Sequence, residues 1–119
     1  MYSVRTLQKG EVLLKAGGLE PYIFLLKSGQ LIVSKETKTG AVRHLGYVNP
    51  GEFVGEMAYL SEKYAYASTV LAVTDCEVIE ILADNFYDVL AKNPVWLKAL
   101  VKSLVHRIET LNNKVTSTT

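Results

Sequence analysis

The most distinctive stretch of the chain reads NPGEFVGEMAYL and occupies residues 49–60. It opens on Asn49-Pro50-Gly51, three residue types that favour a tight turn, and a second glycine, Gly55, stands directly before the acidic Glu56. A polar segment follows, and residues 67–70 (ASTV) return to the small and β-branched residues that are common in strands. The stretch therefore predicts a turn, then a segment that begins with a glycine, and then a return to extended chain.

Outward from this stretch, the first part of the chain consists of short apolar and β-branched runs separated by turn residues, such as Gly10, Gly17-Gly18 and Ser28-Gly29. Many short strands with regular turn signals favour a barrel or a sandwich over an alternating α/β fold. We expect strands at Val4–Gln8, Val12–Lys15, Tyr22–Lys27, Leu31–Lys35, Val42–Val48, Ser68–Val73 and Glu77–Leu82.

After Leu82 the pattern becomes helical. Asp84 suits a helix N-terminus, and Lys92-Asn93-Pro94 ends this first helix while Pro94 suits the first turn of a second. Along the second helix, apolar residues recur at alternating spacings of four and three, which is a heptad seam: Leu97, Val101, Leu104, Ile108, Leu111 and Val115. One helix cannot bury such a seam, so it packs either on its own barrel or on a second copy. The narrow stripe on a long helix favours a homodimer.

Composition and charge limit the classes of function. The chain has 119 residues, 49% of them hydrophobic, which fits one modest core, and its 13 basic and 12 acidic residues are spread along the sequence. No charge block indicates nucleic acid or a membrane patch. No apolar run approaches the roughly 18 residues of a membrane span, and residues 1–10 lack a signal-peptide pattern, so we expect a cytoplasmic protein without membrane contact.

Catalysis and metal binding have little support in the sequence. Cys76 is the only cysteine and stands in a strand-like run, which favours a buried hydrophobe over a nucleophile. His44 and His106 have no metal-spaced partner and no serine–carboxylate arrangement, so we interpret both as structural or surface residues. We therefore expect no enzyme, no metal and no resident cofactor.

The order of the glycines resembles the cyclic nucleotide-binding domain family, of the type found in the catabolite activator protein and in regulatory subunits of cyclic-AMP-dependent protein kinase. The resemblance runs along nearly the whole chain, through Lys9-Gly10-Glu11, Gly17-Gly18, residues 22–30 (YIFLLKSGQ), Gly40, Pro50-Gly51 and residues 53–56 (FVGE). It implies a mainly β fold with C-terminal helices, namely a double-stranded β-helix (jelly-roll) barrel of eight strands. A phosphate-binding cassette interrupts this barrel, and a long C-terminal helix follows it. It also implies one domain over residues 1–119, with the barrel over about 1–82 and the C-terminal helices over about 83–114.

The resemblance further implies which residues face a ligand. A short helix from about Gly55 to Leu60 would lie under a sugar-phosphate, with Gly55 letting backbone N–H groups approach the anion and Glu56 accepting a hydrogen bond from the ribose. Alternatively, Gly55-Glu56 only shapes a turn before a helix. The implied ligand-binding set is Gly55, Glu56, Met57, Ala58, Lys63, Tyr66, Ala67, Ser68 and Asn112.

One position departs from the family's pattern. The family places an arginine, which pairs with the cyclic phosphate, just before the small residues that open the strand after the cassette, and here that position is Tyr66. The arginines of this chain are Arg5, Arg43 and Arg107, and Lys63 offers only a flexible point charge. Loss of one member of a buried charged pair costs about 3–5 kcal/mol, a factor of roughly a hundred to several thousand in affinity. We therefore expect weak or no binding of cyclic AMP.

The cassette tyrosines leave two alternatives open. Tyr59, Tyr64 and Tyr66 either fill the pocket from within, or they recognise a different planar ligand or a protein partner. The sequence thus predicts a small homodimeric regulatory or sensor domain with a degenerate phosphate pocket. The alternative is a protein-interaction or dimerisation module on the same fold that binds no nucleotide. We expect no DNA binding by this chain alone; a fragment of a longer regulator remains the other interpretation.

Overall fold

The computed structural model describes residues 2–56, 66, 68–92 and 95–117. The elements follow in the order β1 (Tyr2–Leu7), β2 (Val12–Leu14), β3 (Tyr22–Ser28), β4 (Leu31–Glu36), β5 (Val42–Val48), β6 (Phe53–Val54), β7 (Thr69–Ala72), β8 (Cys76–Leu82), α2 (Ala83–Lys92) and α3 (Val95–Ser117). The mainly β fold with C-terminal helices is confirmed, and every expected strand appears with its ends at most two residues from the expected positions. The additional strand, β6, was not expected.

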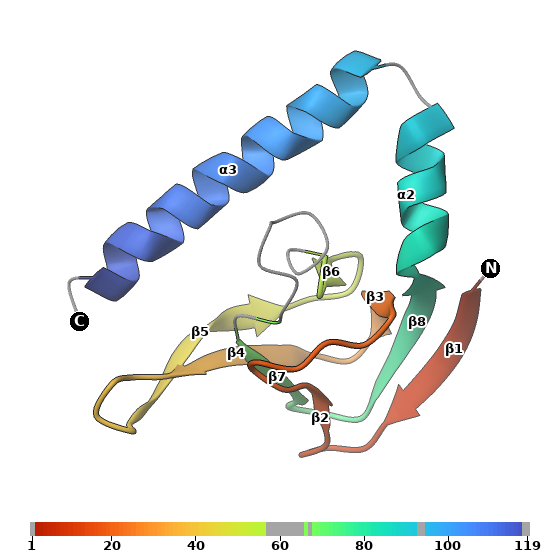
Figure 1. The fold of residues 1–119 in the computed structure, drawn as a ribbon. Helices are drawn as coiled ribbons and strands as arrows, with labels where there is room; N and C mark the ends of the chain where they lie inside the picture. Colours follow the sequence, from red (N-terminus) through yellow and green to blue (C-terminus); the bar gives the residue numbers. More distant parts are fainter. Residues whose placement is uncertain (1, 57–65, 67, 93–94, 118–119) are drawn as a thin grey trace.

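The strands form two antiparallel four-stranded sheets (Figure 1). Their orders are β1-β8-β3-β6 and β2-β7-β4-β5, so most consecutive strands lie in opposite sheets and the chain winds as a roll. In the first sheet β8 is central, pairing Arg5 of β1 with Val78 and Leu25 of β3 with Ile79. Burial alternates along β7 and over the middle of β3, because successive side chains point to opposite faces. Phe24 and Leu26 of β3 are buried in the core, whereas Leu25 between them is partly exposed.

The core lies between the sheets and consists of Leu7, Leu13, Leu14, Phe24, Leu26, Leu31, Val48, Val54, Tyr66, Val70, Ala72, Cys76 and Val78. Cys76 is a free and buried thiol, which confirms its interpretation as a small core residue. Two of the other core residues, Val54 and Tyr66, stand directly before the cassette and at its end, respectively. The cassette is therefore anchored at both ends in the same core.

The turn between β3 and β4 packs closely against the turn between β7 and β8. Gly29 has φ +91°, and a Cβ built on it would collide with the backbone oxygen of Asp75 and lie 2.7 Å from the Sγ of Cys76. Val73 donates its backbone N–H to Gln30 O at 2.9 Å across the same contact. Glycine is required here both for its conformation and for the lack of space.

The helix α2 begins directly after β8, and α3 is the next helix along the chain. Figure 1 shows α2 rising from the end of β8 and α3 running back above the roll. No helix of the described part of the chain is long and apolar enough to cross a membrane. On α3, Leu97 and Val101 are partly buried and Val105 is only 6% exposed, so this face packs against the rest of the chain.

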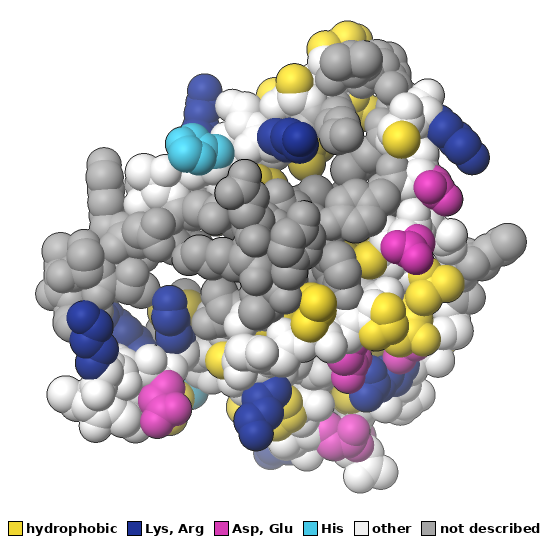
Figure 2. All heavy atoms as spheres, viewed as in Figure 1, with side chains coloured by type: hydrophobic (Ala, Val, Ile, Leu, Met, Phe, Trp, Pro, Cys, Tyr) yellow, Lys and Arg dark blue, Asp and Glu magenta, His cyan; other side chains and the backbone are white. Residues whose placement is uncertain are grey.

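A neighbouring face of α3 is exposed to solvent. Four large apolar side chains at intervals of four residues are between 45% and 67% exposed: Trp96, Leu100, Leu104 and Ile108. In the view of Figure 2, hydrophobic side chains reach the surface at the top of the molecule, where α3 begins. The expected heptad seam is thus divided, with Leu97 and Val101 on the packed face and Leu104 and Ile108 on the exposed one. The side chain of Leu111 is outside the described part.

Candidate functional site

Tyr66, at the position where the family has its phosphate-pairing arginine, is buried in the core. Its side chain is 5% exposed and belongs to the same cluster as Leu14 and Phe24. A Cβ built on Gly55, whose φ is +85°, would lie 3.4 Å from Cε1 of Tyr66 and 3.3 Å from Cδ1 of Leu14. The tyrosine ring therefore lies against the glycine that opens the cassette.

The polar atoms of Tyr66 bond to the segment between β2 and β3. Its hydroxyl accepts the backbone N–H of Glu20 at 3.0 Å and lies 3.3 Å from the carbonyl oxygen of the same residue. Its own backbone N–H donates to Gly18 O at 2.9 Å, and its carbonyl accepts from Gly17 N at 2.8 Å. Burial raises the pKa of the Tyr66 phenol, although the backbone hydrogen bond from Glu20 opposes the rise. The hydroxyl is thus a neutral, satisfied group.

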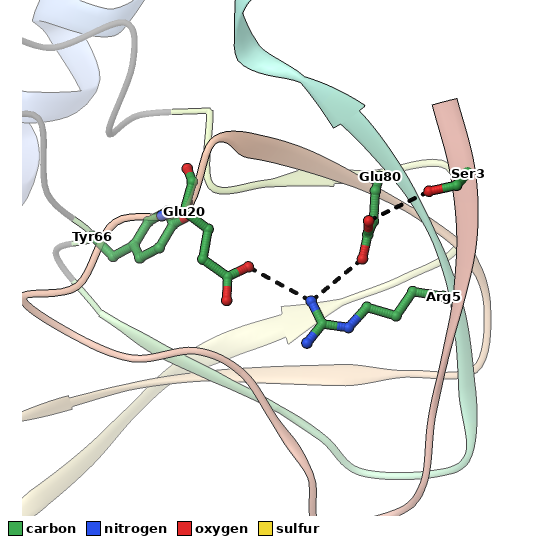
Figure 3. A network of polar contacts seen from close by, with 5 residues as sticks. All are labelled: Ser3, Arg5, Glu20, Tyr66 and Glu80. Carbon is green, nitrogen blue, oxygen red and sulfur yellow. Dashed lines mark hydrogen bonds and ion pairs between the residues drawn. The ribbon is translucent and has the colours of Figure 1, made fainter. Parts of the chain in front are cut away.

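The side chain of Glu20 continues this contact to the first sheet (Figure 3). Its Oε2 lies 3.6 Å from Nη1 of Arg5, and the same guanidinium nitrogen lies 3.4 Å from Oε1 of Glu80. Ser3 donates to Glu80 at 3.4 Å. Because Arg5 is held between two carboxylates, its charge is already compensated.

Glu56 is the charged residue of the expected ligand-binding set that the structure describes. It is partly buried, and desolvation raises the pKa of its carboxyl group, with its own backbone N–H acting in the opposite direction. A partly buried carboxylate at the opening of the cassette can accept hydrogen bonds from hydroxyl groups.

Several of the expected ligand-binding residues lie outside the described residues: Met57, Ala58, Lys63 and Ala67, together with Tyr59 and Tyr64. The expected short helix from Gly55 to Leu60 falls mostly on the same gap. Ser68 is partly buried just before β7, and Asn112 is part of α3 with its side chain outside the described part. Among the described candidates, the structure brings Gly55 and Tyr66 into contact.

Sequence reasoning missed Glu20 and Arg5. Glu20 lies 46 residues from Tyr66, and no local pattern in the sequence links two residues at that separation. His44 and His106 are exposed, in agreement with a surface role. The described residues contain no group of three or more histidine, cysteine, aspartate or glutamate side chains that could hold a metal ion.

The sequence comparisons agree with the fold of the chain. Residues 4–93 match the family model described as "Cyclic nucleotide-binding domain". The chain belongs to the cyclic nucleotide-binding domain family.

Two curated relatives have names that refer to cyclic AMP. The chain is 29% identical over 93 residues to the cAMP-activated global transcriptional regulator CRP of Salmonella typhimurium, covering 78% of this chain and 44% of that protein. It is 28% identical over 104 residues to the Cyclic AMP receptor protein of Thermus thermophilus, covering 87% and 48%. The chain thus spans about half the length of the curated relatives it matches.

Solved structures show the same fold. The Thermus thermophilus catabolite activator protein matches with a TM-score of 0.77 at 22% identity, over 96% of this chain and 53% of that one. The sensor domain of the transcriptional regulator DNR from Pseudomonas aeruginosa matches with a TM-score of 0.79 at 20% identity, over 94% and 75%. An EAL enzyme in its cAMP-bound form matches with a TM-score of 0.82 at 17% identity, over 95% of this chain and 30% of the enzyme.

Proposed function

We propose that the chain is a regulatory domain, without enzyme activity of its own, whose phosphate pocket is closed by Tyr66. Cyclic AMP and cyclic GMP then bind weakly or not at all. The observation that carries this proposal is the buried ring of Tyr66 against Gly55, with its hydroxyl bonded to the backbone of Glu20. A side chain that is packed and hydrogen-bonded in this way leaves neither a positive charge nor free space at its position.

Two effects weaken the binding of an anion at the position of Tyr66. An anion entering this position would meet a neutral phenol where an arginine would form a charge-assisted, two-point contact. Its entry would also require the Tyr66 ring to leave the core, with loss of buried apolar area and of the hydroxyl hydrogen bond. Each effect weakens binding, so a family-type affinity falls by at least the factor of roughly a hundred that follows from the missing charge.

Isothermal titration calorimetry with cyclic AMP, cyclic GMP and a cyclic dinucleotide tests the proposal directly. We expect no heat of binding, or a dissociation constant of about 1 mM or weaker, which corresponds to about −4 kcal/mol. A micromolar dissociation constant for cyclic AMP would show that the tyrosine does not close the pocket, and the proposal would fail.

We also propose that the domain is a homodimer through α3. The support is the exposed row Trp96, Leu100, Leu104 and Ile108, which extends over several turns of one helix face. Contiguous apolar surface of this kind is costly in water and is characteristic of interfaces. The two faces of α3 then have different roles: Val105 packs within the subunit, and the exposed row packs on the same row of a second copy.

Sedimentation at roughly tens of micromolar protein tests the dimer. Leu104→Glu places a charge in the proposed interface and is expected to give a monomer. His106→Glu, at an exposed position of the same helix that lies outside the row, is the matched control and is expected to stay dimeric. A monomeric wild-type protein, or equal behaviour of both variants, would refute this interface.

A further inference from the structure

Residues 17–21 (GGLEP) connect three parts of the fold that are far apart in sequence, and we call this segment the strap. At one end it bonds to Tyr66, at the C-terminal side of the cassette. At the other end it bonds to the first residue of α2. Between the two ends, the side chain of Glu20 reaches β1. The whole segment is only five residues long.

The contact with Tyr66 involves both backbone and side chain. Gly17 N donates to Tyr66 O at 2.8 Å, Tyr66 N donates to Gly18 O at 2.9 Å, and Glu20 N donates to the tyrosine hydroxyl at 3.0 Å. Three bonds to one residue fix its position along the strap. Tyr66 cannot be displaced without breaking at least the bond made by its hydroxyl.

The contact with α2 is a single backbone hydrogen bond at a buried position. Ala83, where α2 begins, donates its N–H to Pro21 O at 2.9 Å, and its side chain is 3% exposed. The first N–H groups of a helix have no partner within the helix, so this bond satisfies one of them. The strap therefore supports the start of α2 from outside the helix.

The strap has little freedom between these contacts. Gly18 N bonds back to Lys15 O at 3.0 Å, and a Cβ built on Gly18 would lie 3.2 Å from that oxygen. Pro21 has a fixed φ. Glu20 is held by Arg5, which in turn pairs with Glu80 of β8, the strand that leads into α2 (Figure 3). These contacts leave the short segment little room to move between its two ends.

We propose that the strap couples the end of the cassette to the start of α2, so that release of Tyr66 loosens the first turn of that helix. Movement at the cassette then reaches the helices through the β2–β3 connection. The coupling is a property of the unliganded domain and holds whether or not a nucleotide binds. If hydrogen exchange shows no coupling, only the coupling is refuted. The proposal that Tyr66 closes the phosphate pocket is tested separately by ligand titration.

The forward test perturbs the cassette end and measures α2. Tyr66→Phe removes the hydroxyl and keeps the ring, and amide hydrogen exchange by NMR is measured at Ala83, with Val78 in the core of β8 as the reference for global opening. We expect Ala83 to exchange on the order of tenfold faster relative to Val78, because a partly buried donor in the strap has lost its acceptor. Tyr47→Phe, which removes the hydroxyl of an exposed tyrosine on β5, is the matched control and should leave this ratio unchanged.

The reverse test perturbs the α2 end and measures the strap. Ala83→Pro removes the N–H that bonds to Pro21, at the first helical position where proline is well tolerated. Coupling is reciprocal, so the amide of Glu20 is expected to exchange faster in this variant, again relative to Val78. If Ala83→Pro does not fold, the forward test decides. An unchanged Ala83-to-Val78 ratio in Tyr66→Phe, or an unchanged Glu20 amide in a folded Ala83→Pro, would overturn the coupling.

Discussion

The substitution Tyr66→Arg tests both the position and the chemistry of the closed pocket. In the unliganded domain it exchanges a buried, hydrogen-bonded phenol for a buried cation without a partner. An uncompensated buried charge costs about 3–5 kcal/mol. For a chain of this length, 1 kcal/mol corresponds to roughly 3–6 °C in melting temperature, so we expect the unliganded variant to melt roughly 10–25 °C below the wild type.

Ligand should reverse this loss in the variant. An anion that pairs with the new guanidinium regains most of the same 3–5 kcal/mol, and the affinity for cyclic AMP should rise by a factor of roughly a hundred to several thousand. At a ligand concentration of about one hundred times the dissociation constant, binding stabilises the folded state by about 2.7 kcal/mol. The variant is therefore expected to be less stable than the wild type without cyclic AMP and to recover much of the difference with it.

The assay is thermal unfolding of three proteins with and without cyclic AMP, followed by calorimetric titration of any protein that responds. Tyr47→Arg is the control, because it makes the same change of residue and charge at a tyrosine that is 59% exposed. Neither it nor the wild type should respond to the nucleotide. A Tyr66→Arg protein that is folded and still does not respond would refute the idea that a single side chain closes an otherwise competent pocket.

Two further predictions concern the carboxyl group of Glu56 and the tight turn at Gly29. Burial raises the pKa of Glu56 above its ordinary value of 4.5, so the folded state holds this proton more tightly than the unfolded state, and stability is lost as the pH rises through that window. Glu56→Gln should therefore raise the melting temperature at neutral pH and make little difference below pH 4.5, and equal effects at both would contradict the assignment. Gly29→Ala should destabilise the fold more than Gly10→Ala in chemical denaturation. Both glycines have φ +91°, but only Gly29 has the backbone of Asp75 and the Sγ of Cys76 within contact of the added Cβ. Equal losses of unfolding free energy in the two variants would mean that the positive φ alone, and not the close contact at Gly29, sets the cost of the added Cβ.

Local sequence patterns were sufficient to predict most of the strands. Turn residues such as Gly10 and Gly40 have positive φ, as expected of the tight turns that separate strands. The strand that escaped prediction, β6, has only two residues, Phe53 and Val54, and too short a run to show an alternating pattern. Its pairing with Phe24 and Leu25 of β3 is a long-range contact that only the assembled sheet defines.

The helical stripe shows a second limit of sequence patterns. Periodicity predicts that one side of α3 is apolar. It does not predict which of those apolar side chains pack within the subunit and which are exposed to solvent. Val105 does not belong to the heptad seam and is nevertheless the most buried of the described α3 side chains. Trp96 and Leu100, also outside the seam, extend the exposed row. The apolar surface is wider than a heptad seam, which is the pattern expected of a helix that packs on two partners at once.

Tyr66 shows what the sequence could and could not decide about the site. The resemblance placed a residue without positive charge at the arginine position, but left open whether that residue packs inward or recognises a ligand. The deciding contacts are with Gly55, Gly17, Gly18 and Glu20, and apart from Gly55 they lie more than 40 residues away in the chain. Two of these bonds use only the backbone of Tyr66, so any residue with a backbone N–H at this position could form them. The backbone path is therefore independent of the side chain. That independence is the physical reason to expect that Tyr66→Arg changes the chemistry of the pocket while the strap keeps its main-chain hold on the cassette.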